Sequence, residues 1–199
     1  MKKINQSFYQ SNNVLELSKT LLGKVVVTKT NNQFTSGKIV EVEAYLGAED
    51  KASHSYNNKK TNRTQPMFDM GGIAYVYLCY GIHYLFNVVV GNTNNPYAIL
   101  IRSIEPIDGI DIMLKRRKFN LLKKQLTNGP GKLTKALGIT TSLNAMSLTG
   151  DKIWIENHDI KVAKKDILSS PRIGVDYAGW DAKLPYRFYI NNNKWVSNA

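Results

Sequence analysis

The chain contains little sulfur and no long apolar run. Its 199 residues include one cysteine, Cys79, which excludes an internal disulfide and a metal site built on several thiolates. No apolar stretch approaches the roughly 20 residues that span a bilayer, and the polar residues after the two N-terminal lysines lack the apolar centre of a signal peptide. A single cysteine also suits a reducing compartment. We therefore expect a soluble protein of the cytoplasm with no membrane partner.

Motifs for metal binding, nucleotide binding and serine nucleophiles are absent as well. The sequence has no His-x-x-x-His, no Cys-x-x-Cys and no clustered acidic loop, so it predicts no metal site. It also lacks a Gly-x-x-x-x-Gly-Lys-Ser/Thr phosphate loop and a nucleophilic serine motif, because the segment 129–132 (Gly-Pro-Gly-Lys) is too short to count.

Acidic residues are scarce relative to basic ones. The chain has 15 Asp and Glu against 27 Lys and Arg, a formal net charge of +12, and such an excess attracts polyanions. The segments 51–63 and 115–135 contain bases and no acid, and neither has the apolar periodicity of a membrane-surface helix throughout, so they favour nucleic acid over a membrane. The bases of the second segment are Lys115, Arg116, Arg117, Lys118, Lys123, Lys124, Lys132 and Lys135.

Hydrophobic residues make up 43% of the chain, enough for one core, and the length fits a single domain over residues 1–199. Strand and helix patterns do not alternate regularly. This predicts an α+β fold with a mainly antiparallel sheet, a protruding β-hairpin and surrounding helices. The expected helices are 14–22, 108–115 with Asp108 as cap, and 129–137; the expected strands are 24–30, 36–45, 75–79, 84–90, 97–104, 153–156, 160–163 and 187–190.

Aromatic residues are concentrated in the segment 75–81. Alternation places Tyr75 and Tyr77 on one face of a strand, and Tyr80-Gly81 forms the expected hairpin tip. A phenol at the tip of a hairpin in a basic chain suggests a wedge that enters a base stack. The alternative is a set of aromatic cross-strand pairs packed in a core.

The strand 36–45 combines carboxylates with a phenol. Alternation puts Glu41, Glu43 and Tyr45 on one face. The face could be solvated, or it could carry a carboxylate general base beside an aromatic ring, as suits hydrolysis at an anomeric carbon. Arg102 interrupts the apolar strand 97–104, where it would pair with Glu41 or Glu43 or anchor a phosphate.

Several segments together resemble one family, the alkyladenine (3-methyladenine) DNA glycosylases of the type found in mammals and many bacteria. They occur in the family's order with similar spacing and cover most of the chain, which makes the resemblance specific. The matching segments are 39–47, 49–50, 52–55, 75–81, Asn87, 98–106, 128–133, 171–174 and 187–189.

The resemblance implies a single α+β domain that binds duplex DNA from the minor groove and flips a damaged purine nucleotide into a pocket. The implied reaction is hydrolysis of the N-glycosidic bond of alkylated or deaminated purines (3-methyladenine, 7-methylguanine, hypoxanthine, ethenoadenine) in base excision repair. Such a monofunctional glycosylase uses water and needs no metal or other cofactor. The resemblance also implies a monomer without an obligate protein partner, associated with the nucleoid in the bacterial cytosol.

Eight residues receive roles from the resemblance. Two act at the reaction: Glu43 as the general base that activates water for attack at C1′, and Arg102 as support for the water and the carboxylate. Tyr45, His54 and Tyr77 enclose the flipped base, and Asn87 lies at the pocket floor, where its bulk disfavours a 2-amino purine. Tyr80 is the wedge, and Ile82 lies beside it. The segment 59–70 matches the family only loosely, so no contact is carried over there.

The rival hypothesis is a non-catalytic nucleic-acid-binding module in which the tyrosine hairpin only stacks on bases. Glu43 beside Tyr45 and His54 argues against it, because a binding module gains nothing from a carboxylate close to a phosphate-rich ligand.

Overall fold

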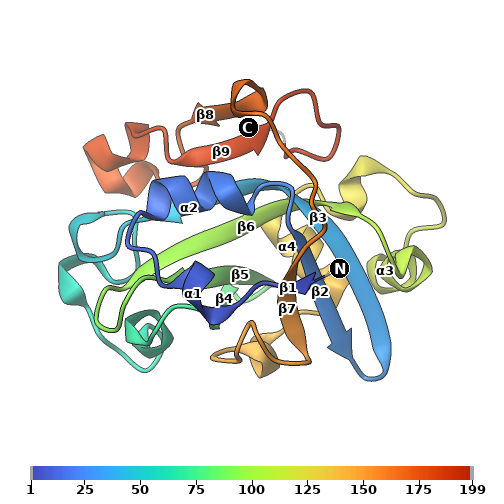
Figure 1. Ribbon diagram of the computed structural model, residues 1–199, viewed down its shortest axis with the longest axis horizontal. Coiled ribbons are helices and arrows are strands. Elements are labelled where there is room, and N and C mark those ends of the chain that lie inside the picture. Colours follow the sequence, from blue (N-terminus) through green and yellow to red (C-terminus); the bar gives the residue numbers. More distant parts are fainter. Residues whose placement is uncertain (1, 198–199) are drawn as a thin grey trace.

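The computed structural model describes residues 2–197, and one curled antiparallel sheet organises them (Figure 1). Within these residues the sheet has nine strands in the order β1-β7-β2-β3-β6-β5-β4, with β9 paired to β3 and β8 paired to β9. The α+β class with a mainly antiparallel sheet is confirmed. The strands are β1 Lys2–Lys3, β2 Val25–Thr30, β3 Gln33–Tyr45, β4 Ala74–Cys79, β5 His83–Val90, β6 Tyr97–Pro106, β7 Ile153–Asn157, β8 Ile167–Ser170 and β9 Arg187–Ile190.

Short helices surround the sheet. Helix α2 lies against β3 and β6, and α4 lies against β5 and β6 (Figure 1). The α-helices are α1 Gln6–Tyr9, α2 Val14–Leu21, α3 Ile110–Arg117 and α4 Pro130–Leu137. Single turns of 3₁₀ helix occur at η1 Gly47–Glu49, η2 Tyr56–Asn58, η3 Gln65–Phe68, η4 Lys124–Leu126, η5 Thr141–Leu143, η6 Lys164–Asp166 and, over two kinked turns, η7 Asp176–Lys183.

Helix α2 follows directly from its sequence. The side chain of Asn13 accepts a hydrogen bond from the Glu16 N–H at 3.2 Å, which caps the first turn. Val14, Leu17 and Leu21 recur at helical spacing and are buried in the main core. The helix therefore joins the core through one apolar stripe.

The long strand β3 is the centre of the sheet. It pairs with β6 along most of its length, with β2 over its first half and with β9 at residues 41–43. A register irregularity between Ile39 and Val42 lets the strand change its second neighbour from β2 to β9. Both edges and both faces of β3 are covered there, so Glu41 and Glu43 are 0% exposed and do not form a solvated face.

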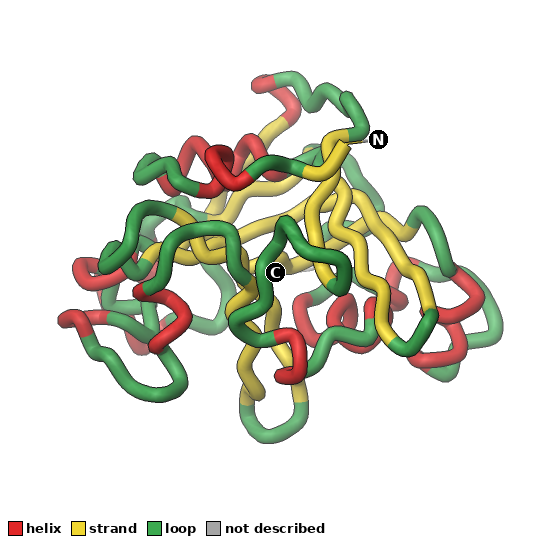
Figure 2. Tube along the Cα trace, turned by 60° about the horizontal axis from the view of Figure 1, so that its bottom comes forward, coloured by secondary structure: helices red, strands yellow, loops and turns green. Residues whose placement is uncertain are grey.

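The hairpin of β4 and β5 ends as the sequence predicted. Tyr80 and Gly81 both have left-handed backbone angles, with φ of +49° and +71°, and the Ile82 N–H bonds the Cys79 carbonyl at 3.1 Å. An aromatic residue with positive φ is uncommon. Figure 2 shows the hairpin extending from the lower edge of the molecule. The tip thus lies apart from the core that anchors its strands.

Two local predictions are wrong. The helix predicted from Asp108 begins at Ile110 with Gly109 as its cap, because the Asp108 carboxylate instead accepts a hydrogen bond from Ser36 Oγ at 2.6 Å. The segment 160–163 is irregular rather than a strand. Its side chains pack over Gly23, where a Cβ would lie 2.9 Å from Val162. Tertiary contact therefore decides both segments. The sequence also did not predict β1, α1 and β8.

None of the helices among residues 2–197 combines the length and the apolar character that crossing a bilayer requires.

Glu41 is the hub of a buried ionic network. Its Oε1 accepts hydrogen bonds from Arg102 Nε at 3.0 Å, Arg187 Nε at 2.7 Å and Ser197 Oγ at 2.7 Å. Its Oε2 accepts the Ser197 N–H at 2.7 Å. The network ties β3, β6, β9 and the segment around Ser197 together without exposing the carboxylate.

We expect Glu41→Gln to lower the free energy of unfolding by about 3–5 kcal/mol, the cost of leaving buried charges without their partner. Urea denaturation of the variant and the parent measures the change. Glu49→Gln is the matched control, because Glu49 is exposed and in no ion pair among the described residues. A loss below about 1 kcal/mol for Glu41→Gln, within the range of ordinary surface substitutions, would show that the network contributes little to stability.

Candidate active site

A cavity of about 1060 Å³ lies where β3, β4, β5 and β6 meet the loop 50–59 and the start of α4. Its wall contains every residue that the sequence analysis assigned to catalysis or to substrate binding, although they come from distant parts of the chain. These residues are Glu43, Tyr45, His54, Tyr77, Asn87 and Arg102.

Glu43 is held by donors on both carboxylate oxygens. Its Oε1 accepts the Ile173 N–H at 2.8 Å and forms an ion pair with Arg102 Nη1 at 3.1 Å, and its Oε2 accepts Tyr45 Oη–H at 2.9 Å. A carboxylate offers about four lone-pair positions. Two hydrogen bonds and one ion pair therefore orient the group and leave acceptor capacity for a further donor from the cavity.

Arg102 joins the two buried acids. Its Nε contacts Glu41 and its Nη1 contacts Glu43, so the planar guanidinium keeps the two carboxylates in fixed relation. Burial alone would lower the pKa of Arg102, but the charges of Glu43 and Glu41 outweigh it and raise that pKa. The guanidinium is therefore a permanent cation behind the Glu43 carboxylate.

The Tyr45 hydroxyl is a hydrogen-bond donor to the Glu43 carboxylate. Burial, and next the neighbouring Glu43 charge, raise the pKa of Tyr45 well above its usual value. The Arg172 guanidinium lies 4.8 Å from the centre of the Tyr45 ring and forms a bidentate pair with Asp50 at 2.5 and 2.8 Å. The ring is thus fixed at its face as well as at its hydroxyl.

His54, Tyr75 and Tyr77 form an aromatic wall. His54 Nδ1 lies 3.0 Å from Tyr75 Oη, and its ring meets the Tyr77 ring edge-on at 4.6 Å between centres. Burial, and then the charge of Arg63, lower the pKa of His54 to about 4, so its imidazole is neutral at pH 7. Asn87 Nδ2 donates to the Tyr75 carbonyl at 3.1 Å, which fixes the amide beside this wall.

The hairpin tip is the most exposed apolar feature of the site. Tyr80 is 89% exposed and borders the cavity, whereas Ile82 is 72% exposed and borders a second hollow instead. Large apolar side chains that stand in solvent commonly mark an interaction surface. The two residues predicted to enter DNA are therefore both free to do so.

Sequence reasoning left three residues of this region without a role. The Arg63 guanidinium lies 4.7 Å from the centre of the Tyr77 ring. Tyr177 is 70% exposed and borders the cavity, and its hydroxyl donates a hydrogen bond to the Ala52 carbonyl at 3.0 Å. Arg63 is the last base of the acid-free segment 51–63, so the charge pattern of the sequence could have identified it as a residue of this region. Arg172 lies in a segment that matched the family but carried no assignment.

The predicted basic cluster 115–135 is divided by the fold. Arg116 Nη1 donates to the Ala136 carbonyl at 2.9 Å, and Arg117 Nη2 donates to the Gln125 carbonyl at 3.1 Å. Partial burial lowers the pKa of both guanidinium groups. These two side chains hold α3 against its neighbours, whereas Lys115, Lys118, Lys123, Lys124 and Lys135 are exposed.

Among residues 2–197 no group of three or more His, Cys, Asp or Glu side chains is placed to hold a metal ion.

Comparison with known proteins gives one consistent result. A family model described as methylpurine-DNA glycosylase (MPG) matches residues 7–194. A protein of Chlamydia felis (strain Fe/C-56) named "Putative 3-methyladenine DNA glycosylase" is 50% identical over 190 residues, 95% of this chain and 96% of that protein. Proteins of the same name from Clostridium botulinum (strain Alaska E43 / Type E3) and Bacillus cytotoxicus (strain DSM 22905 / CIP 110041 / 391-98 / NVH 391-98) are each 43% identical, covering 98% and 96% of this chain and 98% and 97% of their own lengths.

The lowered pKa of His54 makes a testable statement about charge in the cavity. We expect NMR titration to show an imidazole that stays neutral until about pH 4, against an ordinary value of 6.5. His54→Gln identifies its resonance among the three histidines of the chain. A midpoint near 6.5 would contradict this assignment.

The same shift affects stability. Between about pH 6.5 and 4 the unfolded chain binds a proton that the folded chain excludes, so the contribution of neutral His54 is present above pH 6.5 and declines as the pH falls towards 4. Urea denaturation of His54→Gln should therefore show a weaker pH dependence in this range than the parent does.

Proposed function

The chain belongs to the methylpurine-DNA glycosylase family and is a DNA glycosylase of the 3-methyladenine type, and we propose that it hydrolyses the N-glycosidic bond of a damaged purine flipped from duplex DNA, with Glu43 as general base. Family membership sets aside the alternative of a purely binding module. The substrates we propose are alkylated and deaminated purines.

One observation carries the proposal. Glu43 is a buried carboxylate that accepts two hydrogen bonds, forms an ion pair with Arg102 and keeps a lone-pair position for a further donor, at the wall of a cavity lined by aromatic rings. A water in the cavity can donate to that position and direct its oxygen at C1′ of a nucleotide whose base lies against the rings. Proximity and orientation of this kind contribute a large part of enzymatic rate.

In the proposed reaction the bond from C1′ to the purine nitrogen breaks as water attacks C1′. The purine leaves with the bonding electron pair, the water oxygen forms the new bond to C1′, and its proton passes to Glu43. Positive charge develops on the sugar, and the Glu43 carboxylate stabilises it electrostatically. Arg102 positions the carboxylate and donates no proton.

The aromatic wall suits an electron-poor base. Tyr45 and Tyr77 present ring surfaces on which a cationic methylated purine is attracted by the π electrons. His54 is neutral near pH 7, so it adds no repulsive charge beside such a base. Asn87 is fixed by its bond to Tyr75, and its bulk would oppose a purine with a 2-amino group.

We propose that the Tyr80 ring fills the gap that the flipped nucleotide leaves in the base stack, with Ile82 beside it. Extrusion of a nucleotide costs a few kcal/mol of stacking and pairing, and an exposed ring at a narrow hairpin tip can replace part of that stacking. Support comes from the exposure of both side chains and from the position of Tyr80 at the edge of the cavity.

Glu43→Gln tests the catalytic role. Because the amide cannot accept the proton of water, we expect the single-turnover rate of base release to fall by about 10²- to 10⁴-fold, while affinity for the damaged duplex persists. The assay is alkaline cleavage of a labelled duplex with hypoxanthine or ethenoadenine, with fluorescence anisotropy for binding. Glu49→Gln should match the parent. A Glu43→Gln enzyme as fast as the parent removes Glu43 from the mechanism.

Tyr80→Ala tests the wedge. Loss of the ring should weaken binding to a damaged duplex by about 1–3 kcal/mol, the range for a stacked aromatic contact. Tyr80→Phe keeps the ring and should retain most of the affinity, which separates stacking from a role of the hydroxyl. Equal affinity in Tyr80→Ala and the parent would refute the wedge.

A further inference from the structure

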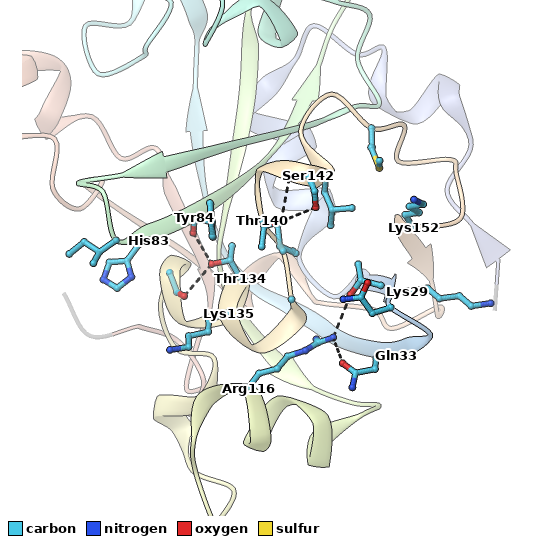
Figure 3. Close-up of a pocket in the computed structure, with 18 residues that line it drawn as sticks. Lys29, Gln33, His83, Tyr84, Arg116, Thr134, Lys135, Thr140, Ser142 and Lys152 are labelled. Carbon is cyan, nitrogen blue, oxygen red and sulfur yellow. Dashed lines mark hydrogen bonds between the residues drawn. The ribbon is translucent and has the colours of Figure 1, made fainter.

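A second hollow, of about 650 Å³, lies on the other side of the β4–β5 hairpin from the catalytic cavity. Figure 3 shows it between α4, the turn after it, the β2–β3 hairpin and the base of the β4–β5 hairpin. We call it the basic groove. Its charged lining residues are Lys29, Arg116, Lys135 and Lys152.

The hairpin divides the two hollows. Along β5, Leu85 and Asn87 line the catalytic cavity, while Tyr84 lines the basic groove, as the alternation of a strand requires. Ile82, in the turn just before β5, also lines the groove. Thr134 Oγ1 of α4 donates to the Tyr84 carbonyl at 2.7 Å and so holds the hairpin base in place. A ligand that receives Tyr80 at the hairpin tip therefore extends over both hollows.

The groove carries an excess of positive charge. No Asp or Glu lines it. The Lys29, Lys135 and Lys152 ammonium groups are exposed and have no hydrogen bond or ion pair within residues 2–197. Asp151, beside Lys152 in the chain, forms its ion pair with Lys3 at 2.7 Å, and the pKa of Asp151 is lowered by Lys3 and to a smaller extent by the charge of Lys29. These three lysines are therefore available to an anionic ligand.

The fourth cation is fixed in the groove. Arg116 donates to the Ala136 carbonyl and to Gln33 Oε1 at 3.0 Å, so its charge has a defined position (Figure 3). Hydroxyl donors lie at the opposite rim, where Thr140 Oγ1 and Ser142 Oγ are 2.8 Å apart. Fixed guanidinium charge, free ammonium groups and hydroxyls are the usual partners of phosphate oxygens.

We propose that the basic groove binds the phosphodiester backbone of the duplex arm that lies across the hairpin from the flipped nucleotide. This inference rests on the proposed function, because it requires that the Tyr80 side chain enters the base stack of the duplex. Its contacts are sequence-independent, so the groove adds affinity and sets the register of the duplex on the enzyme without selecting the lesion.

A triple variant tests the groove. Lys29, Lys135 and Lys152 are replaced by Gln, and the matched control replaces the exposed Lys161, Lys164 and Lys165, which lie outside both hollows, so both variants lose three charges. Affinity for an undamaged duplex is measured by anisotropy over a range of salt. The groove variant should bind 10- to 100-fold more weakly at low salt, with a salt slope reduced by about 2.7, or about 0.9 for each lost phosphate contact.

The control variant should keep the slope of the parent. Equal slopes in both variants would overturn the proposal. This measurement uses undamaged DNA and needs no base release, so failure of the groove and failure of the glycosylase proposal are seen separately.

A second measurement locates the contact. Duplexes with a non-hydrolysable abasic analogue at a fixed position are shortened from one end or the other. For the parent, shortening the arm that lies in the groove should weaken binding strongly. For the groove variant, which has already lost the contacts to that arm, the same shortening should weaken binding only slightly. Equal sensitivity of parent and variant to both trimmings overturns the placement. Displacement of the duplex by micromolar inorganic phosphate would identify a small-anion site and also overturn it.

Discussion

The rest of the site depends on the contact of Arg102 with two buried carboxylates. Desolvation of three charged groups is costly and is offset only where geometry and further hydrogen bonds satisfy each of them. Here Glu41 also accepts hydrogen bonds from Arg187 and Ser197, which gives it four in all, whereas Glu43 accepts two, from Tyr45 and the Ile173 N–H. Glu41 is thereby committed to structure, which leaves Glu43 as the carboxylate with spare acceptor capacity.

The hairpin of β4 and β5 stands beside this fixed centre. Its strands belong to the central sheet, while its tip bears Tyr80 beyond the core. The cavity that Glu43 lines and the basic groove share His83 and Gly131, and a Cβ on Gly131 would lie 2.8 Å from the His83 ring. Close approach of the hairpin to α4 therefore keeps the two hollows adjacent and on opposite sides of one rigid element.

The sequence predicted the sheet class and α2 from periodicity, and the hairpin tip from turn chemistry. The family resemblance pointed to six of the residues that line the cavity. It could not predict features that arise from distant contacts. The burial of Glu41 requires β9 beside β3, and the pairing of Asp108 with Ser36 replaces the expected helix cap. Lys29 and Lys152 become neighbours only through the Lys29 N–H to Lys152 carbonyl bond at 2.8 Å, outside the basic segments that composition had singled out.

The bonds from Ser197 to Glu41 span 156 positions of the chain. A ribosome makes residues from the N-terminus onward, so Glu41 and Arg102 emerge long before Arg187 and Ser197 can reach them. A nascent chain that has completed β3 and β6 thus holds an acidic centre without its last donors, in a sheet that lacks β8 and β9. The Glu41 carboxylate therefore receives its last donors only at the end of synthesis, when the C-terminal segment closes the buried network over the sheet.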